Sequence, residues 1–110
     1  FKDGKPVMAV GAPGGTRIIT AVAQTILNYF VFKKSLYEAV SAPRIHQQWT
    51  PDQLTVENQP VAVETLRELD RMGWLIKRMP QQSAVMAIVR DGDQLIGVAD
   101  PRDIGTSAGY

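Results

Sequence analysis

The fold and the chemistry of this chain depend on one short stretch, Gly11-Ala12-Pro13-Gly14-Gly15-Thr16. It lies between an apolar run at residues 6–10 and a helical pattern that begins near Thr16. Glycine lacks a Cβ and reaches positive φ without strain, so a ligand can approach this backbone closely. The N–H groups at the start of a helix also carry partial positive charge. A strand-to-helix turn of this kind binds an anion or the oxyanion of an acyl-transfer intermediate, or it contains glycine for geometry alone.

The composition is that of one small globular domain. The chain has 110 residues, of which 45% are apolar and 21% are charged, and we predict a single domain over residues 1–110. The formal net charge is +1 and the basic residues are scattered, which argues against a nucleic-acid-binding surface. Cysteine is absent and His46 is the only histidine, so the sequence offers no ligand set for zinc. We expect neither a metal nor a cofactor.

The first residues indicate a chain that belongs to a longer protein. Residues 1–6 are typical of the end of one strand, a turn at Asp3-Gly4 and the start of the next strand. A natural domain rarely starts within a hairpin arm, and Phe1 is not methionine. We therefore expect this domain to be a fragment cut from a larger polypeptide.

Hydrophobic periodicity predicts an α+β domain with two main helices and a mostly antiparallel sheet. The first helix covers residues 16–32, with Ile18 and Ile19 on its apolar stripe. Ser35 with Glu38 three residues later predicts a capping box that opens a short helix. The other expected elements are a strand at 7–10, a helix at 36–41, a loop at 44–52, a strand at 54–57, a helix at 60–72 with Ala62 inward, a strand at 74–79 and a hairpin of strands 84–89 and 95–99.

Three side chains are candidates either for chemistry or for structural hydrogen bonds. His46 lies in a loop with hydrogen-bonding neighbours, and a hydrogen-bonded structural histidine is a simpler interpretation than a catalytic one. Arg44 and Arg102 each follow a proline. A guanidinium in this position usually ties loops together through carbonyl or carboxylate groups, and direct binding of a ligand is the alternative.

No hydroxyl group in the chain has the sequence context of an activated nucleophile. The available hydroxyl groups are those of Thr16, Thr20, Ser83 and Ser107. Ser107 fits the letters of GxSxG at residues 105–109 but not the strand–turn–helix pattern that such a motif requires, so none of the four lies in a nucleophile elbow. An N-terminal nucleophile needs Thr, Ser or Cys at the first position, which Phe1 cannot replace. The sequence therefore offers a candidate oxyanion site without an attacking group.

Four segments of the chain carry a family resemblance. Residues 11–19 resemble a Gly-Ser-Pro-Gly-Gly segment that leads into an isoleucine-rich helix, and residues 38–49 resemble a Glu-Ala…Ala-Pro-Arg-Phe-His-His-Gln-Trp stretch. Residues 99–102 resemble a Ser-Asp-Pro-Arg motif, and residues 108–110 match a C-terminal Ala-Gly-Tyr. The four matches occur in the same order and cover nearly the whole chain. On these residues the chain resembles the γ-glutamyltranspeptidases.

The resemblance implies an N-terminal-nucleophile hydrolase, a four-layer αββα sandwich made by autocleavage into a large and a small subunit. This chain would be the C-terminal portion of the small subunit, with the large subunit and the upstream part of the small subunit as partners. In such enzymes an upstream threonine attacks the γ-glutamyl carbonyl of glutathione or a related amide. Gly14 and Gly15 would then form the oxyanion hole, and the acyl group would pass to water or to an amine.

The resemblance also implies a periplasmic or extracellular enzyme and places the residues that bind the glutamate outside this chain. We expect the isolated chain to be inactive, because the nucleophile lies upstream. Its first helix is apolar over much of its circumference. We therefore expect exposed apolar surface that favours self-association of the fragment.

The chain departs from the family pattern at three places, so alternatives for its function remain open. Ala12 replaces the usual serine, Gln47 replaces a second histidine, and residues 81–84 differ from the usual Gly-Ser-Thr-Gln. Relatives with the same glycine segment act on cephalosporin-type amides or on poly-γ-glutamate, so an acylase or amidase of this superfamily is one alternative. A non-catalytic domain whose glycine turn packs or binds an anion is the other.

Overall fold

The computed structural model describes residues 1–81 and 83–108. Its helical elements are α1 (Arg17–Ile26), the π-helical η1 (Leu27–Val31), α2 (Leu36–Ser41) and α3 (Val63–Arg71). Its strands are β1 (Met8–Gly11), β2 (Ile45–His46), β3 (Leu54–Glu57), β4 (Ile76–Met79), β5 (Met86–Asp91) and β6 (Gln94–Ala99). Three residues lie outside the described ranges. They are Gln82, in the divergent segment 81–84, and Gly109 and Tyr110, in the C-terminal Ala-Gly-Tyr match.

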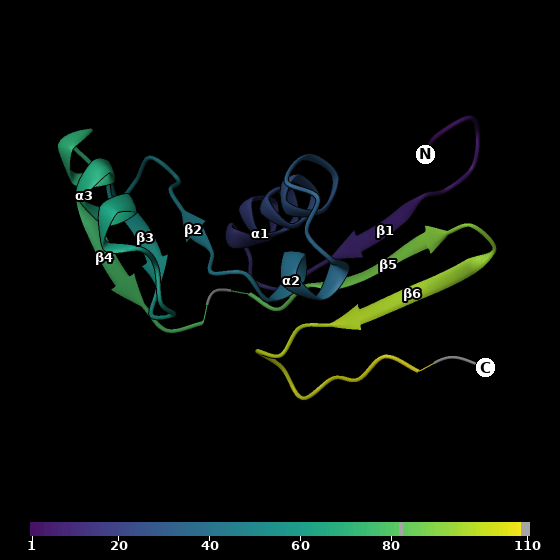
Figure 1. Cartoon of the computed structure of the whole chain (residues 1–110). Helices are drawn as coiled ribbons and strands as arrows, with labels where there is room; N and C mark the ends of the chain where they lie inside the picture. Colours follow the sequence, from purple (N-terminus) through teal and green to yellow (C-terminus); the bar gives the residue numbers. More distant parts are fainter. Residues whose placement is uncertain (82, 109–110) are drawn as a thin grey trace.

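The strands form two three-stranded sheets with α1 between them (Figure 1). One sheet has the order β1-β5-β6 and is antiparallel throughout. The other has the order β2-β3-β4, in which β2 and β3 are antiparallel, whereas β3 and β4 are parallel and are connected through α3. Because α1 contacts both β1 and β2, it links the two sheets.

The apolar core lies where α1 and α2 cover one face of the β1-β5-β6 sheet. Successive side chains of a strand point to opposite faces. Every second residue of the β5 segment, namely Val85, Ala87 and Val89, is therefore buried in one cluster with Leu36 and Val40 of α2. Fully burying a Val or Leu side chain contributes about 1.5–3 kcal/mol, so the packing of α2 on β5 is a large favourable part of the folding free energy.

Most of the expected elements are present, and the α+β class is confirmed. The predicted first strand, first helix and C-terminal hairpin correspond to β1, to α1 with η1, and to β5-β6. The capping box is present as predicted, with Glu38 N–H donating to Ser35 Oγ at 3.2 Å and Ser35 N–H donating to Glu38 Oε2 at 2.9 Å. The Asp3-Gly4 turn is also present, with both residues at positive φ.

Three details differ from the sequence-based expectation. The segment expected as a loop contains β2, whose pairing with β3 involves only two residues and is too short for a sequence pattern. The strands form two sheets instead of one, because the β3-α3-β4 crossover makes a separate parallel pair. Ala62 and Ile19, which were expected to face inward, are exposed, Ile19 by 75%, because no other described segment covers them.

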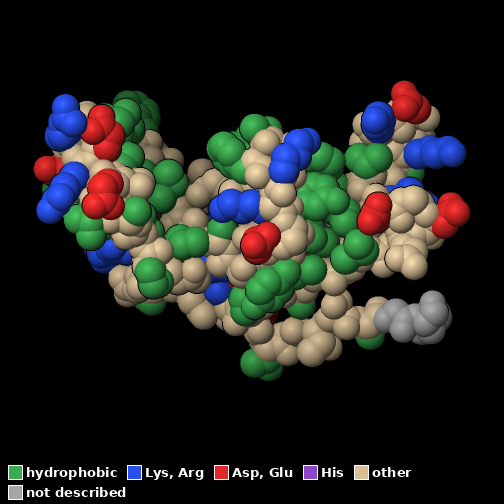
Figure 2. All heavy atoms as spheres, in the orientation of Figure 1, with side chains coloured by type: hydrophobic (Ala, Val, Ile, Leu, Met, Phe, Trp, Pro, Cys, Tyr) green, Lys and Arg blue, Asp and Glu red, His purple; other side chains and the backbone are tan. Residues whose placement is uncertain are grey.

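Apolar side chains gather on the outer surface of the central helices (Figure 2). Leu27, Val31 and Phe32, at the end of the α1–η1 helix, are all exposed, as is Tyr37 of α2. This surface agrees with the apolar circumference expected for the first helix. None of the helices in the described ranges is long and apolar enough to cross a membrane.

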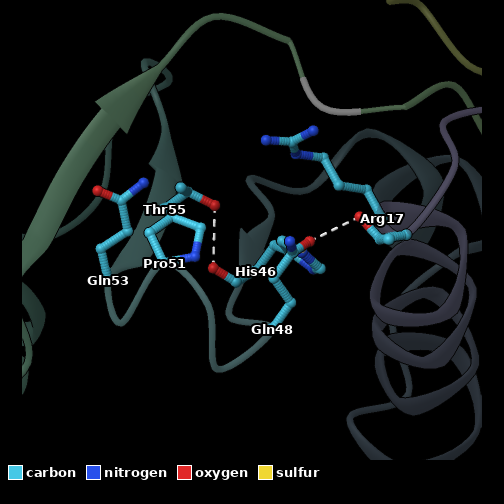
Figure 3. A pocket seen from close by; sticks show the side chains of 7 residues that line it. Arg17, His46, Gln48, Pro51, Gln53 and Thr55 are labelled. Atoms are coloured by element: carbon cyan, nitrogen blue, oxygen red, sulfur yellow. Dashed lines mark hydrogen bonds between the residues drawn. The ribbon is translucent and has the colours of Figure 1, made fainter.

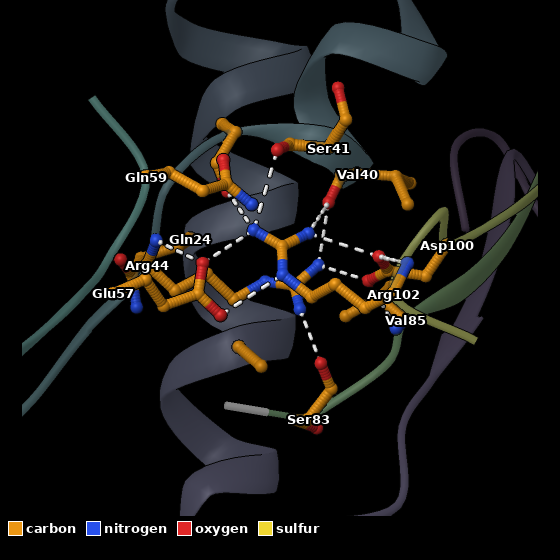
Figure 4. Close-up of polar contacts among 12 residues, drawn as sticks. Gln24, Val40, Ser41, Arg44, Glu57, Gln59, Ser83, Val85, Asp100 and Arg102 are labelled. Atoms are coloured by element: carbon orange, nitrogen blue, oxygen red, sulfur yellow. Dashed lines mark hydrogen bonds and ion pairs between the residues drawn. The ribbon is translucent and has the colours of Figure 1, made fainter. Parts of the chain in front are cut away.

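Four buried charged side chains join the two sheets (Figure 4). Asp100, which follows β6, pairs with Arg44 through Oδ2 at 2.5 Å and with Arg102 through Oδ1 at 3.0 Å. Arg102 also donates to Glu57 of β3, with 2.5 Å between Nη2 and Oε2 and 3.0 Å between Nε and Oε1. Each of the four side chains is at most 3% exposed. The cluster therefore connects the end of one sheet to the centre of the other.

Backbone carbonyl groups accept further hydrogen bonds from both arginines. Arg44 donates to the carbonyl oxygen of Val40 at 2.5 Å and to that of Ser83 at 2.8 Å. Arg102 donates to the carbonyl oxygen of Ala42 at 2.8 Å. The expectation that both arginines tie loops together is therefore confirmed.

Asp100→Asn should lower the free energy of unfolding by about 3 kcal/mol, because it leaves two buried guanidinium groups without their shared counter-charge. Urea unfolding followed by tryptophan fluorescence measures this loss. Asp93→Asn, an exposed aspartate in the β5–β6 turn, is the matched control and should change the unfolding free energy by less than about 0.5 kcal/mol. Equal losses for the two variants would contradict the role of the cluster.

The same carboxyl group makes stability depend on pH. Burial alone raises the pKa of Asp100, but hydrogen bonds from Val85 N–H, Arg44 and Arg102 outweigh burial and lower the pKa below its usual value. A carboxyl group whose pKa is lower in the folded state than in the unfolded state stabilises the fold. This stabilisation is complete above the unfolded pKa of about 3.9 and is lost as the pH falls through the lower, folded pKa. The unfolding free energy should therefore fall below about pH 4, and Asp100→Asn should flatten this part of the curve. Parallel curves for the two proteins would contradict this assignment.

Candidate active site

The glycine turn between β1 and α1 has the backbone geometry that its sequence predicts. Gly14 and Gly15 have φ values of 132° and 60°, where residues with side chains are rarely found. The Gly14 carbonyl accepts from Arg17 N–H and the Gly15 carbonyl accepts from Ile18 N–H, both at 3.2 Å. The turn therefore leads directly into the first hydrogen bonds of α1.

The direction of the Gly15 N–H follows from the Gly14 carbonyl. In a trans peptide the C=O and N–H groups point in opposite directions. Because the Gly14 carbonyl points along α1 toward Arg17, the N–H of Gly15 points away from the helix, beyond its N-terminus. Across residues 1–81 and 83–108, neither glycine N–H donates to a protein acceptor, and both residues are exposed. Free donors at the positive end of a helix suit an oxygen that carries negative charge.

Ser83 fixes the chain just before the two glycines. Its hydroxyl group donates to the carbonyl oxygen of Pro13. A Cβ added at Gly14 would lie 3.0 Å from Ser83 Oγ and 3.1 Å from Ser83 Cβ, so a side chain there would be crowded by Ser83 as well as strained by φ. The sequence identifies Ser83 only as an available hydroxyl group. It does not predict the contact with Pro13, because residues 70 positions apart leave no local signal of their pairing.

His46 and Gln48 hold the first turn of α1 from the β2 side (Figure 3). His46 is 6% exposed, with Nδ1 at 2.8 Å from Thr20 Oγ1 and Nε2 at 2.8 Å from Gln48 Oε1. The same Gln48 oxygen accepts from Thr16 Oγ1 at 2.6 Å. These contacts agree with the hydrogen-bonded structural role expected for His46, whereas the sequence pattern does not predict the link from Gln48 to Thr16.

A small cavity of 120 Å³ lies beside the turn. It is lined by Thr16, Arg17, His46, Gln48, Pro51, Gln53 and Thr55 (Figure 3). In the Ser-His-Asp triad a carboxylate orients the histidine, whereas here His46 Nε2 contacts the amide oxygen of Gln48 and Nδ1 contacts Thr20. Ser107 lies away from this cavity, against Gly97 of β6. Within the described part of the chain there is no group of three or more residues that could hold a metal ion.

Known proteins resemble the chain over its whole length. The family model described as Gamma-glutamyltranspeptidase matches residues 1–110. The glutathione hydrolase proenzyme of Escherichia coli is 38% identical over 111 residues, which cover 99% of this chain and 19% of that protein. Glutathione hydrolase proenzyme 1 of Schizosaccharomyces pombe is 35% identical over 111 residues, covering 98% of this chain and 18% of that protein. The chain therefore spans about a fifth of the length of these relatives.

Solved structures show the same relationship. The γ-glutamyltranspeptidase from Pseudomonas nitroreducens complexed with L-DON has a TM-score of 0.91 at 30% identity, covering 100% of this chain and 58% of that chain. The T380A mutant of the Helicobacter pylori enzyme has a TM-score of 0.88 at 38% identity, covering 94% of this chain and 57% of that chain. The α+β arrangement is accordingly that of the N-terminal-nucleophile hydrolases. The chain belongs to the γ-glutamyltranspeptidase family.

Proposed function

We propose that the protein containing this chain transfers and hydrolyses the γ-glutamyl groups of glutathione and related γ-glutamyl amides through an acyl-enzyme. In this proposal Gly14 and Gly15 form the oxyanion hole. The observation that supports it most directly is the pair of exposed glycine N–H groups at the start of α1, which have no protein acceptor among the described residues. The glutathione hydrolases and γ-glutamyltranspeptidases that resemble the chain support the same class of reaction.

The reaction needs such donors when the nucleophile attacks. The hydroxyl of an N-terminal threonine outside this chain gives its proton to that residue's own α-amine and forms a C–O bond to the γ-carbonyl carbon, and the carbonyl π electrons move to the oxygen. The N–H groups of Gly14 and Gly15 donate to this oxyanion, and because they are oriented in advance they need little reorganisation. The C–N bond then breaks and the amine leaves with the proton. Water or an acceptor amine releases the glutamyl group from the threonine by the same steps.

We further propose that the large subunit and the upstream part of the small subunit complete the site and cover this chain. On the face of the β1-β5-β6 sheet that points away from α2, Met86 and Ile88 are exposed and border a cavity of 550 Å³. In a four-layer sandwich a second sheet packs on such a face. The apolar character of this face supports a packing partner there.

Gly15→Val in the full-length enzyme should lower kcat by ~10²–10³, with a smaller change in KM. A β-branched side chain cannot adopt φ near 60° unless the peptide that carries the N–H moves. Initial rates with a γ-glutamyl anilide, measured on correctly cleaved enzyme, give kcat.

The matched control for this substitution is Gly92→Val. Gly92 has φ of 58° in the β5–β6 turn, and a Cβ added at Gly92 or at Gly15 would meet no atom within 4 Å. The two variants therefore carry similar local strain, but only one alters the turn at α1. A kcat for Gly15→Val within about threefold of the control would leave the glycine turn with a packing role alone.

The purified 110-residue chain should not release the amine from a γ-glutamyl anilide by itself. Oxyanion donors lower the barrier only after a nucleophile attacks, and Phe1 supplies none. The release of the coloured amine is followed against buffer, with the full-length enzyme as the positive control. Steady turnover by the isolated chain above the buffer rate would show that it contains its own nucleophile.

A further inference from the structure

We propose that Gln48 is a positioning residue for the oxyanion turn. Its side-chain oxygen, held by His46, tethers Thr16 and thereby sets the direction of the N–H groups of Gly14 and Gly15. The catalytic consequence rests on the proposed function, whereas the tether is a property of the fold and can be tested separately.

The glycine turn needs such a tether because it has few contacts of its own. Glycine has the greatest backbone freedom of any residue, and a Cβ at Gly15 would meet nothing within 4 Å. Ser83 holds the turn on one side through Pro13. On the other side Thr16 is the first residue with a side chain, so its anchor controls the peptide that joins it to Gly15.

The anchor of Thr16 is a single amide oxygen with a defined orientation. Thr16 Oγ1 donates to Gln48 Oε1 at 2.6 Å. Gln48 Nε2 donates to the carbonyl oxygen of Thr50 at 3.0 Å, which determines which end of the amide faces Thr16. His46 Nε2 lies 2.8 Å from the same Gln48 oxygen, and because that oxygen can only accept, the histidine nitrogen carries the proton. The oxygen therefore receives two donors from two different segments.

Thr16 uses its side chain for this contact and not for capping α1. It occupies the N-cap of α1, yet its side chain makes no capping hydrogen bond. A threonine at this position commonly accepts from an N–H of the first helical turn. Here its hydroxyl group is directed to Gln48 instead. The first N–H groups of α1, those of Arg17 and Ile18, donate to the carbonyls of Gly14 and Gly15 and not to the Thr16 side chain.

His46 adds a second anchor one helical turn further along α1. Its Nδ1 lies 2.8 Å from Thr20 Oγ1, and residues four apart lie on one face of a helix. The backbone carbonyl of His46 accepts from Thr55 Oγ1 of β3 at 2.9 Å, so the histidine is itself fixed in the sheet. Two anchors one turn apart restrain the rotation of α1 about its axis, and with it the glycine turn.

Gln48→Leu in the correctly cleaved full-length enzyme tests the proposal. It removes the acceptor at similar side-chain size, and kcat with a γ-glutamyl anilide should fall about tenfold while KM changes less than about twofold. Gln47→Leu is the matched control, because the hydrogen bond recorded for the neighbouring Gln47 amide among the described residues is to Asp52, at 3.4 Å. Because Gln48→Leu also removes the hydrogen bonds to His46 and Thr50, circular dichroism must first show that both variants are folded at the assay temperature. A kcat for Gln48→Leu within about twofold of the control would overturn the positioning role.

Variants of Thr16 test the same hydrogen bond from its donor. Thr16→Val should lower kcat as much as Gln48→Leu does, and Thr16→Ser, which keeps the hydroxyl group, should restore it. Because both substitutions remove the same hydrogen bond, from Thr16 Oγ1 to Gln48 Oε1, the double variant should be no slower than the slower single variant. Losses that multiply in the double variant would show that the two residues act independently and would overturn the tether.

Amide hydrogen exchange in residues 11–20 provides a measurement that does not depend on activity. Exchange in this segment should be faster in Gln48→Leu than in Gln47→Leu, because the turn opens more often without its anchor. Equal exchange in the two variants would overturn the tether. If the wild-type enzyme fails to act on γ-glutamyl anilides, the proposed function fails, and the exchange result still decides the structural claim.

Discussion

The buried carboxylate of Asp100 is the interaction on which the rest of the structure depends. It lies between two guanidinium groups, from Arg44 before β2 and from Arg102 after β6, and Arg102 extends the link to Glu57 of β3. Burying these charges is tolerated only when each has a partner, because an unpaired ion in the interior is strongly destabilising. Apolar contacts are not directional and allow small shifts. The ion cluster therefore fixes the relative placement of the two sheets more sharply than the apolar core does.

The candidate active site depends on the same cluster. Arg44 donates to the carbonyl oxygen of Ser83 at 2.8 Å, and the Ser83 hydroxyl group donates to Pro13, just before the glycines. Arg44 also directly precedes β2, which carries His46 and leads to Gln48. Both supports of the glycine turn are therefore connected to one buried arginine. A site on a loop gains the rigidity of the core when its anchors extend to buried groups.

Local patterns predict the parts of this fold that local energetics determine. The capping box at Ser35 and the C-terminal hairpin depend on residues close together in the sequence, and both are predicted correctly. Proline neighbours predict that the two arginines tie loops together, but not that they share one carboxylate. The missed features are contacts between distant residues, such as the pairing of His46 with Thr55 and the contact of Ser83 with Pro13. The spacing of residues in a single sequence does not specify such distant partners. The family, in contrast, is identified by four motifs in the expected order.

The two glycines are required for different physical reasons, and this explains why the turn needs support from outside. A Cβ at Gly14 would be crowded, because Ser83 Oγ would lie 3.0 Å away, whereas Gly15 has room but adopts φ of 60°. Both residues leave their N–H groups open to a substrate oxygen, yet they lack the side-chain contacts that usually hold a loop. Oxyanion stabilisation requires donors that are oriented before the charge develops. Because the restraints act at Pro13 and Thr16, on either side of the glycines, the turn can remain accessible and still be held in one orientation.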